Sequence, residues 1–347
     1  MIVMMSLKDF CDYVKEHVIT CLPDVYEDAQ VDIKRVVKNN GLVLQGLTIA
    51  KQGSNVSPTL YLENEYEKYL DGHGLSQVLK EIADQYLVFD AQNKSFPGLT
   101  DNIKDYSWVK ERLVTQVCNT WRNNDRFDEI PHMEREDLSY IYKVMVAEAP
   151  TGAATITVNN KMLEMWGVTV KELHKDAVEN TNKISPAVVE TMGQVLSSLT
   201  DDPNILGLGG FMEEIPVSEM MFIVSNPQRL GGAVHMFNTE CLDSIAQKVG
   251  TDLIILPSSV HEVICISSSH GNLEEFTNMV REVNMSSVSP DEQLSDNVYY
   301  YDAKTKEIML GSEHEKRMQE NQQEKSNVVS MMESMDQEYG QRKAGGR

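Results

Sequence analysis

Residues 31–50 read VDIKRVVKNNGLVLQGLTIA, two runs of β-branched and aliphatic residues separated by Asn40-Gly41. This dipeptide suits a two-residue type I′ turn, because both turn positions take positive φ angles. The pattern therefore predicts an antiparallel hairpin formed by Val31–Lys38 and Leu42–Ala50. The short apolar run Thr59–Leu62 follows and completes a predicted three-strand meander.

Helical patterns flank this meander on both sides. Before it, apolar residues recur at helical spacing behind Ser6, a favoured N-cap residue, and predict an amphipathic helix over Phe10–Val18. After it, the same spacing predicts helices over Glu65–Leu70, Leu75–Tyr86 and Leu113–Trp121. These helices would cover one face of the meander.

The second half of the chain alternates predicted hairpins with single helices. The predicted strands are Tyr140–Ala147, Ala153–Val158, Met221–Val224, Ala233–Met236, Leu253–Leu256, Val260–Ile266, Asn297–Tyr301 and Glu307–Leu310. The predicted helices begin at the capping box of Thr169 and Glu172 and at Ser185-Pro186, and cover Glu240–Val249 and Leu273–Val283. Because no regular β-α-β rhythm appears, the sequence predicts an α+β fold of antiparallel hairpins and meanders covered by helices.

The length of 347 residues predicts two packed units, because a single hydrophobic core stops growing near about 250–300 residues. The stretch Asn123–Asp137 loses its periodicity and fills with charge, which is typical of a connection between units. We therefore predict an N-terminal α+β unit over 1–125 and a C-terminal α+β unit over 136–310. Residues 311–347 are predicted to form a flexible, mostly disordered, charged tail that contains methionines.

The net charge is −22, and the tail from Gly311 contributes little of it, with seven acidic against six basic residues. The acidity thus belongs to the folded body, which would repel phosphate backbones, so no direct binding to nucleic acid is predicted. The five cysteines are scattered and never form a C-x-x-C pair, so no disulfide framework or zinc knuckle is indicated. No apolar run is long enough for a membrane span or a signal peptide, which predicts a soluble cytoplasmic protein.

The segment LPSSVHE at 256–262 contains Ser259, His261 and Glu262, the residue types of nucleophilic hydrolysis. If Val260–Ile266 is a strand, His261 and Glu262 point to opposite faces, whereas Ser259 and His261 share one. The acid of a triad would then come from elsewhere. The alternative interpretation is that Pro257–Ser259 forms a turn whose hydroxyls cap backbone amides.

No cofactor and no metal site are predicted. His235, His261 and His270 lie near one another in the sequence, but no H-x-x-x-H or H-E-x-x-H spacing occurs. The glycines of Gly207–Gly210 lack the lysine of a P-loop and a following helix N-terminus, so they predict a flexible connector. The run Tyr299–Tyr301 is expected to pack in the core rather than to stack on bases.

Several segments together resemble a family of uncharacterised proteins from anaerobic gut bacteria, known only as a domain of unknown function. They are VVKNNG at 36–41, GSNVSPTLYL at 53–62, MWGVTVKEL at 165–173, LPSSVHEV at 256–263 and LSDNVYYYD at 294–302. The resemblance covers about residues 7–302, and the second half is also distantly similar to another uncharacterised bacterial family. It brings no catalytic residues and implies an association with mobile elements of these bacteria.

The leading functional prediction is a non-enzymatic interaction or regulatory protein with an unidentified protein partner. It rests on the missing catalytic constellation, the acidic body and an apolar cluster in the tail formed by Val328, Val329, Met331, Met332 and Met335. One alternative is a hydrolase that uses Ser259 and His261. Another is an acidic mimic of DNA that blocks a nucleic-acid-binding protein, which would require acids clustered on one face.

Overall fold

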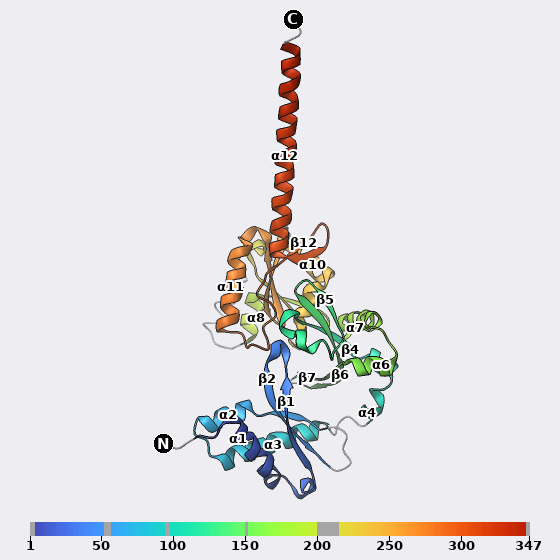
Figure 1. Cartoon of the computed structure of the whole chain (residues 1–347), viewed down its shortest axis with the longest axis vertical. Coiled ribbons are helices and arrows are strands. Elements are labelled where there is room, and N and C mark those ends of the chain that lie inside the picture. The colour runs from blue at the N-terminus through green and yellow to red at the C-terminus, as the bar shows by residue number, and fades with distance from the viewer. Residues whose placement is uncertain (1–3, 52–56, 94–97, 150–151, 200–214, 345–347) are drawn as a thin grey trace. The chain divides into compact units, whose positions relative to one another are not determined.

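The computed structural model describes residues 4–51, 57–93, 98–149, 152–199 and 215–344 of the chain (Figure 1). The predicted connector Gly207–Gly210 lies outside these residues. Antiparallel sheets combined with helices confirm the predicted α+β fold. The chain divides into two compact units, Met1–Pro186 with Ser289–Gln293 and Ala187–Val288 with Leu294–Arg347.

The first unit begins with helix α1 (Leu7–His17), whose N-cap Ser6 accepts a hydrogen bond from the backbone N–H of Asp9 at 3.2 Å. A three-stranded antiparallel sheet follows, in the order β1 (Gln30–Val37), β2 (Val43–Ala50) and β3 (Thr59–Tyr61). Asn40 and Gly41 have positive φ angles of 57° and 74°, as the dipeptide predicts. The predicted two-residue turn is wrong, because the Lys38 N–H donates to the Leu42 carbonyl and the residues between them form a 3₁₀ turn, η3 (Asn39–Gly41). The three paired strands still confirm the predicted meander.

Helices α2 (Glu63–Leu70) and α3 (Leu75–Asn93) follow the meander, as predicted. One core joins them with α1 and the sheet, and its fully buried residues include Phe10, Val14, Leu47, Ile49, Val78, Ile82 and Tyr86. The hydroxyl of Tyr86 donates to the carbonyl of Ile49 in β2 and thereby fixes α3 on the sheet. Short helices α4 (Leu99–Asn102) and α5 (Tyr106–Lys110) lead to a second sheet.

Strand β6 (Leu138–Ala149) is the centre of this second sheet. It pairs in antiparallel fashion with β4 (Leu113–Asn119), β5 (His132–Arg135) and β7 (Gly152–Thr157). Helices α6 (Asn160–Trp166) and α7 (Val170–Ile184) follow, and α7 begins with the predicted capping box of Thr169 and Glu172. A buried hydrogen bond of 2.8 Å from the Thr115 N–H to Thr181 Oγ1 holds α7 against β4.

The predicted helix over Leu113–Trp121 is wrong, because Leu113–Asn119 forms strand β4. Six of the seven residues of this strand are buried, so apolar residues occupy both faces and no alternation is visible in the sequence. The β-branched residues Val114, Thr115 and Val117 favour the strand. Trp121, which the helical pattern places in the core, is 90% exposed.

The stretch predicted as a connection between units also takes part in the second sheet. It forms a 3₁₀ helix, η4 (Trp121–Arg126), and strand β5. The division of the chain after Pro186 thus differs from the predicted boundary between 125 and 136. Charge and loss of periodicity indicate a surface segment, and such a segment need not separate two cores.

The second unit contains a six-stranded antiparallel sheet. Its order is β13 (Glu307–Leu310), β12 (Tyr299–Asp302), β10 (Leu253–Ser259), β11 (Glu262–Ser267), β9 (Phe222–Ser225) and β8 (Val188–Thr191). Helices α8 (Met192–Leu199), α10 (Thr239–Val249), α11 (Leu273–Ser286) and α12 (Gly311–Ala344) accompany it. Apolar residues of α11 pack on one face in a core of Ile254, Leu256, Ile266, Leu273, Val280 and Val298.

Two further predicted elements, from Ser185 onward, are wrong. Ser185-Pro186 precedes strand β8 instead of opening a helix, because the β-branched Val188, Val189 and Thr191 pair with β9. Ala233–Met236 forms part of a 3₁₀ helix, η6 (Gly232–Phe237), which follows Gly231 at a φ of 68°. All six residues of η6 are buried, so its apolar run shows no helical periodicity and resembles a strand in the sequence.

The backbone of the segment predicted as a tail forms helix α12, which is 34 residues long (Figure 1). The flexibility of this segment stays a prediction. Across the described residues, no helix has both the length and the apolar character that crossing a membrane requires.

Candidate functional site

The three residues considered for hydrolysis lie at the turn between β10 and β11. Strand β10 continues through Ser259, and Val260 and His261 form the turn, so the turn lies later than predicted. The Oγ atom of Ser259 accepts a hydrogen bond from the backbone N–H of His261 at 3.0 Å. Glu262 accepts a hydrogen bond of 3.3 Å from the Ser258 hydroxyl. The Ser259 hydroxyl therefore caps the turn.

The ring of His261 is held by the backbone of a neighbouring loop. Its Nδ1 atom accepts a hydrogen bond of 3.0 Å from the N–H of Gly231. Since a neutral imidazole has only one bare nitrogen, this bond leaves the proton on Nε2. A hydrolytic base needs the opposite tautomer, in which Nε2 takes the proton of serine. This geometry argues against His261 as a base, and the hydrolase hypothesis stays a prediction.

The three histidines considered for a metal occupy different settings. His235 is buried within η6, and His270 follows β11 with its Nε2 atom 2.5 Å from the carbonyl of Ser218. Within the part of the chain that the structure describes, no three histidine, cysteine, aspartate or glutamate residues are grouped so that they could hold a metal ion.

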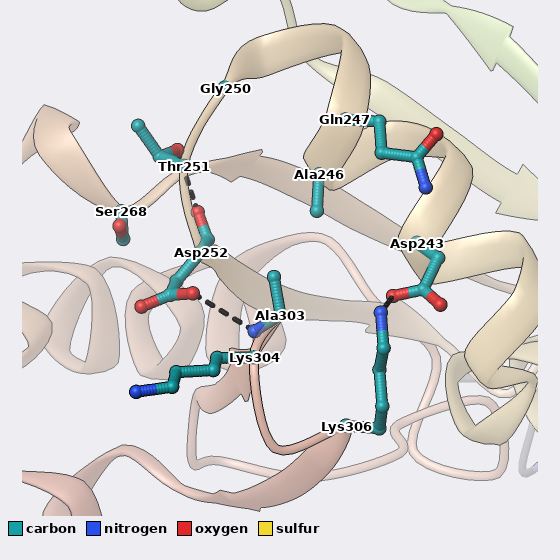
Figure 2. A pocket seen from close by; sticks show the side chains of 10 residues that line it. All are labelled: Asp243, Ala246, Gln247, Gly250, Thr251, Asp252, Ser268, Ala303, Lys304 and Lys306. Atoms are coloured by element: carbon teal, nitrogen blue, oxygen red, sulfur yellow. Dashed lines mark hydrogen bonds and ion pairs between the residues drawn. The ribbon is translucent and has the colours of Figure 1, made fainter.

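An open pocket of about 600 Å³ lies in the second unit, where α10 ends, β10 begins and the β12–β13 turn passes (Figure 2). It is lined by Asp243, Ala246, Gln247, Gly250, Thr251, Asp252, Ser268, Ala303, Lys304 and Lys306. Gly250 ends α10 at a φ of 77°, the left-handed conformation that favours glycine. The helix can therefore stop there and let Thr251 and Asp252 enter the pocket wall.

The two carboxylates of the pocket are both engaged by the β12–β13 hairpin. Asp252 accepts hydrogen bonds from the Ala303 N–H at 2.9 Å and from the Tyr300 hydroxyl at 2.7 Å. Asp243 accepts from the ammonium of Lys306 and from the hydroxyl of Tyr301, and these hydrogen bonds lower the pKa of its carboxyl group. These acids therefore hold the β12–β13 hairpin against the pocket wall.

Lys304 is the remaining charged group of the pocket. Its side chain is exposed, and it forms no ion pair with the residues that the structure describes. One exposed ammonium in an open pocket gives a weak hold on an anion, because water screens it. Among the residues that line the pocket, no nucleophile is paired with a base.

Helix α12 begins at this same edge of the sheet. The Gly311 N–H donates to the Val298 carbonyl at 2.8 Å, and a Cβ atom at Gly311 would lie 3.0 Å from a methyl of Val298. One turn later, the ring of His314 stacks on Tyr300 with ring centroids 3.5 Å apart. Arg317 binds Glu307 of β13 at 3.1 Å. The first two turns of α12 are thus fixed to the sheet.

Tyr300 connects the pocket with the base of α12. Its hydroxyl donates a hydrogen bond to Asp252 in the pocket wall, and its ring stacks on the ring of His314. Burial, followed by the hydrogen bond to Asp252, raises the pKa of Tyr300 to about 12, so the phenol stays protonated and donates. We call this set of residues, Asp252, Tyr300 and His314, the helix-base cluster. Any movement of the pocket wall would reach α12 through it.

Replacing Asp252 by alanine is expected to loosen this cluster. The change leaves the Tyr300 hydroxyl and the Ala303 N–H without their acceptor, which costs about 1–3 kcal/mol of the free energy of unfolding. Urea unfolding monitored by circular dichroism measures it. Asp252→Asn retains one acceptor oxygen and is the matched control, with a smaller expected loss. Equal stability of the alanine variant and the wild type would contradict the cluster's structural role.

The fold and the site define an α+β protein of two units with antiparallel sheets, a pocket and a C-terminal helix. The chain belongs to the DUF5688 family, a family of unknown function whose model matches residues 7–303. The prediction of a domain-of-unknown-function family is thereby confirmed. No curated protein and no solved structure matches the chain. The family match ends within the β12–β13 turn, so α12 lies outside it.

Sequence reasoning missed the helix-base cluster. Its members come from the start of β10, from β12 and from α12, and no spacing rule brings them together. The only available signal was the position of His314, four residues after Leu310, the last residue of a correctly predicted strand.

Proposed function

We propose that this protein is a non-enzymatic interaction protein and that helix α12 binds its protein partner. One observation carries the proposal. The base of α12 is anchored on the second unit, yet every residue from Lys316 to Asn327, the end of its described side chains, is exposed.

The length and polarity of α12 support this role. A helix of 34 residues extends about 51 Å at 1.5 Å per residue, far beyond its anchored turns. The described side chains from Lys316 to Asn327 are mostly polar and exposed, and a helical stretch of this kind is marginal in water. A partner that packs along it would supply the missing stabilisation, as in proteins that take a helix into a groove.

The charges of the described part of α12 also fit a protein partner. Acidic and basic residues are interspersed along it. They are Glu315, which is half-buried, and the exposed Lys316, Arg317, Glu320, Glu324 and Lys325. Interspersed charges of both signs give register and specificity to helix pairing. A nucleic acid would instead demand a surplus of basic residues.

We further propose that the protein acts in the cytoplasm of an anaerobic gut bacterium and is encoded on a mobile element. Its five cysteines are all free, and four of them are buried. Free cysteines fit a reducing compartment, where thiols do not pair.

Affinity capture from lysate of the native host tests the role of α12. The full chain is expected to retain a stoichiometric partner, and a chain ending at Leu310 is expected to lose it. His314→Ala should weaken retention by roughly three- to tenfold, because loss of ring stacking loosens the base of the helix. Mass spectrometry of the retained proteins provides the measurement.

His17→Ala is the matched control for this experiment. His17 stacks on Tyr13 in α1 with centroids 4.2 Å apart, so the variant also loses a stacked imidazole, but in the first unit. It should retain the partner fully. Retention of the same partner by the chain ending at Leu310 would refute the proposal that α12 binds it.

A further inference from the structure

Beyond its anchored turns, helix α12 carries a stripe of residues spaced at alternating intervals of three and four. We call this stripe the α12 seam, and its members are Met318, Asn321, Lys325, Val328, Met332, Met335 and Tyr339. These intervals place the members on one side of a helix and form the heptad repeat of a coiled coil. Met318 and every second member after it occupy a positions, and the others occupy d positions.

Most of the α12 seam is apolar. All members except Asn321 and Lys325 are methionine, valine or tyrosine. Val329 and Met331 widen the apolar stripe at the neighbouring e and g positions. At its start the seam is open to solvent, because Met318 is 48% exposed. In a coiled coil, each a or d side chain fits into a hole formed by four residues of a facing helix, so the seam suits a helical partner.

The two polar members of the seam restrict the choice of that partner. Lys325 is exposed and forms no ion pair with the residues that the structure describes. Arg317, in the anchored part of α12, instead binds Glu307 at 3.1 Å and Glu313 at 2.8 Å. A polar residue within an apolar seam costs stability and selects the register and the partner of a coiled coil.

The charge of Lys325 disfavours pairing of α12 with a second copy of itself. In a parallel pair of identical helices, residues with the same number face each other, so two Lys325 ammonium groups would meet. Like charges repel, and the repulsion grows where the seam excludes water. Asn321 has no such effect, because two facing amides can hydrogen-bond to each other. A carboxylate opposite Lys325 would instead form an ion pair across the seam.

We propose that the α12 seam forms a coiled coil with a helix of a different protein. That helix carries apolar residues at its own a and d positions and an aspartate or glutamate opposite Lys325. The inference rests on the function proposed for α12, and it adds the chemistry of the partner and the way in which the two helices pack.

Exchange of the seam charge between two full-length chains tests this pairing. The Lys325→Glu chain is the probe, because it keeps the apolar members of the seam and presents a carboxylate opposite Lys325. An equimolar mixture of wild type and Lys325→Glu should form a one-to-one dimer. Its dissociation constant should be at least about tenfold lower than that of either chain with itself, since each chain alone brings like charges together. Sedimentation equilibrium measures all three constants.

Lys316→Glu is the matched control for this experiment. Lys316 is exposed and lies two residues before Met318, on the side of α12 away from the seam, so the variant makes the same change of charge there. Its mixture with the wild type should associate no more than the wild type alone. Met332→Asp, added to the Lys325→Glu chain, should abolish the pairing, because it places a charge in an apolar layer.

The same variants report on the natural partner in affinity capture from lysate of the native host. As bait, Lys325→Glu should retain that partner at least about tenfold less than the wild type, because two carboxylates then face each other. Lys316→Glu should retain it fully.

Three results would overturn the proposal. The first is a mixture of wild type and Lys325→Glu that stays monomeric. The second is equal association of the wild type alone and of the mixture, which would make a second copy the partner. The third is equal retention of the natural partner by the wild type and Lys325→Glu. The function proposed for α12 fails separately, when a chain ending at Leu310 retains that partner as well as the full chain does.

Discussion

Replacing Lys143 by methionine is expected to raise the free energy of unfolding at pH 7 by about 1–3 kcal/mol. In the native chain, burial of the ammonium lowers its pKa to about 8, which means that the charged form is disfavoured on folding. Methionine keeps the length of the side chain and removes the charge. The side chain remains partly exposed, so solvent screens part of its charge. The gain in the free energy of unfolding should therefore stay below the value that corresponds to the full pKa shift. Urea unfolding at pH 7 measures the difference.

The gain from Lys143→Met should depend on pH in a defined direction. The pKa is lowered in the folded state, so between pH 8 and 10.5 the unfolded chain binds more protons than the folded chain. The wild type therefore gains stability from this group as the pH rises through that window, and the advantage of the variant shrinks. Lys183→Met, a control at an exposed ion pair, should change stability by less than about 0.5 kcal/mol. A destabilised Lys143→Met variant at pH 7 would contradict the assignment of Lys143 as an uncompensated cation.

Replacing Gly232 by alanine is expected to lower the free energy of unfolding by about 3 kcal/mol. A Cβ atom at this position would lie 2.7 Å from the backbone N of Asn226, 2.7 Å from the carbonyl of His261 and 2.5 Å from the Ser225 hydroxyl. Two of these neighbours are backbone atoms, so relief requires movement of the β10–β11 turn or the end of β9. Chemical unfolding measures the loss, and the chemical shifts of His261 in NMR spectra report the displaced turn.

Gly74→Ala is the matched control for Gly232→Ala. A Cβ atom at Gly74 would meet nothing within 4 Å, so this variant should stay within about 0.5 kcal/mol of the wild type. If Gly232→Ala is equally stable, the close approach of η6 to the β10–β11 turn is not maintained in solution.

Local chemistry was enough to predict the elements with strong signals. The Asn40-Gly41 turn, the Ser6 cap and the Thr169 capping box each satisfy backbone groups within a few residues, so their effect is visible in the sequence alone. The strands β10 and β11 also followed from adjacent apolar runs. These elements were sufficient to predict the α+β fold.

The wrong elements share a different cause. Strand β4 and the 3₁₀ helix η6 are almost completely buried, so neither segment shows a separate polar face in the sequence. Periodicity then carries no information, and the tertiary environment decides the conformation. The assignment of Ser289–Gln293 to the first unit reflects an association between distant segments, which periodicity does not reveal.

The candidate site could not be predicted for the same reason. Asp252, Tyr300 and His314 are joined by the folding of the second unit. By contrast, Ser259 and His261 are neighbours in sequence, which made them visible, but their hydrogen bonds serve the turn.

Hydrogen–deuterium exchange on the full chain, alone and in the complex captured from lysate, tests the role of α12 most directly. In the free protein, we expect fast exchange of the backbone amides beyond Met318, because the described side chains there, up to Asn327, are exposed. In the complex, the same amides should become protected, while the sheet of the second unit changes little. Protection confined to other elements, with unchanged exchange along α12, would contradict the proposal that this helix binds the partner.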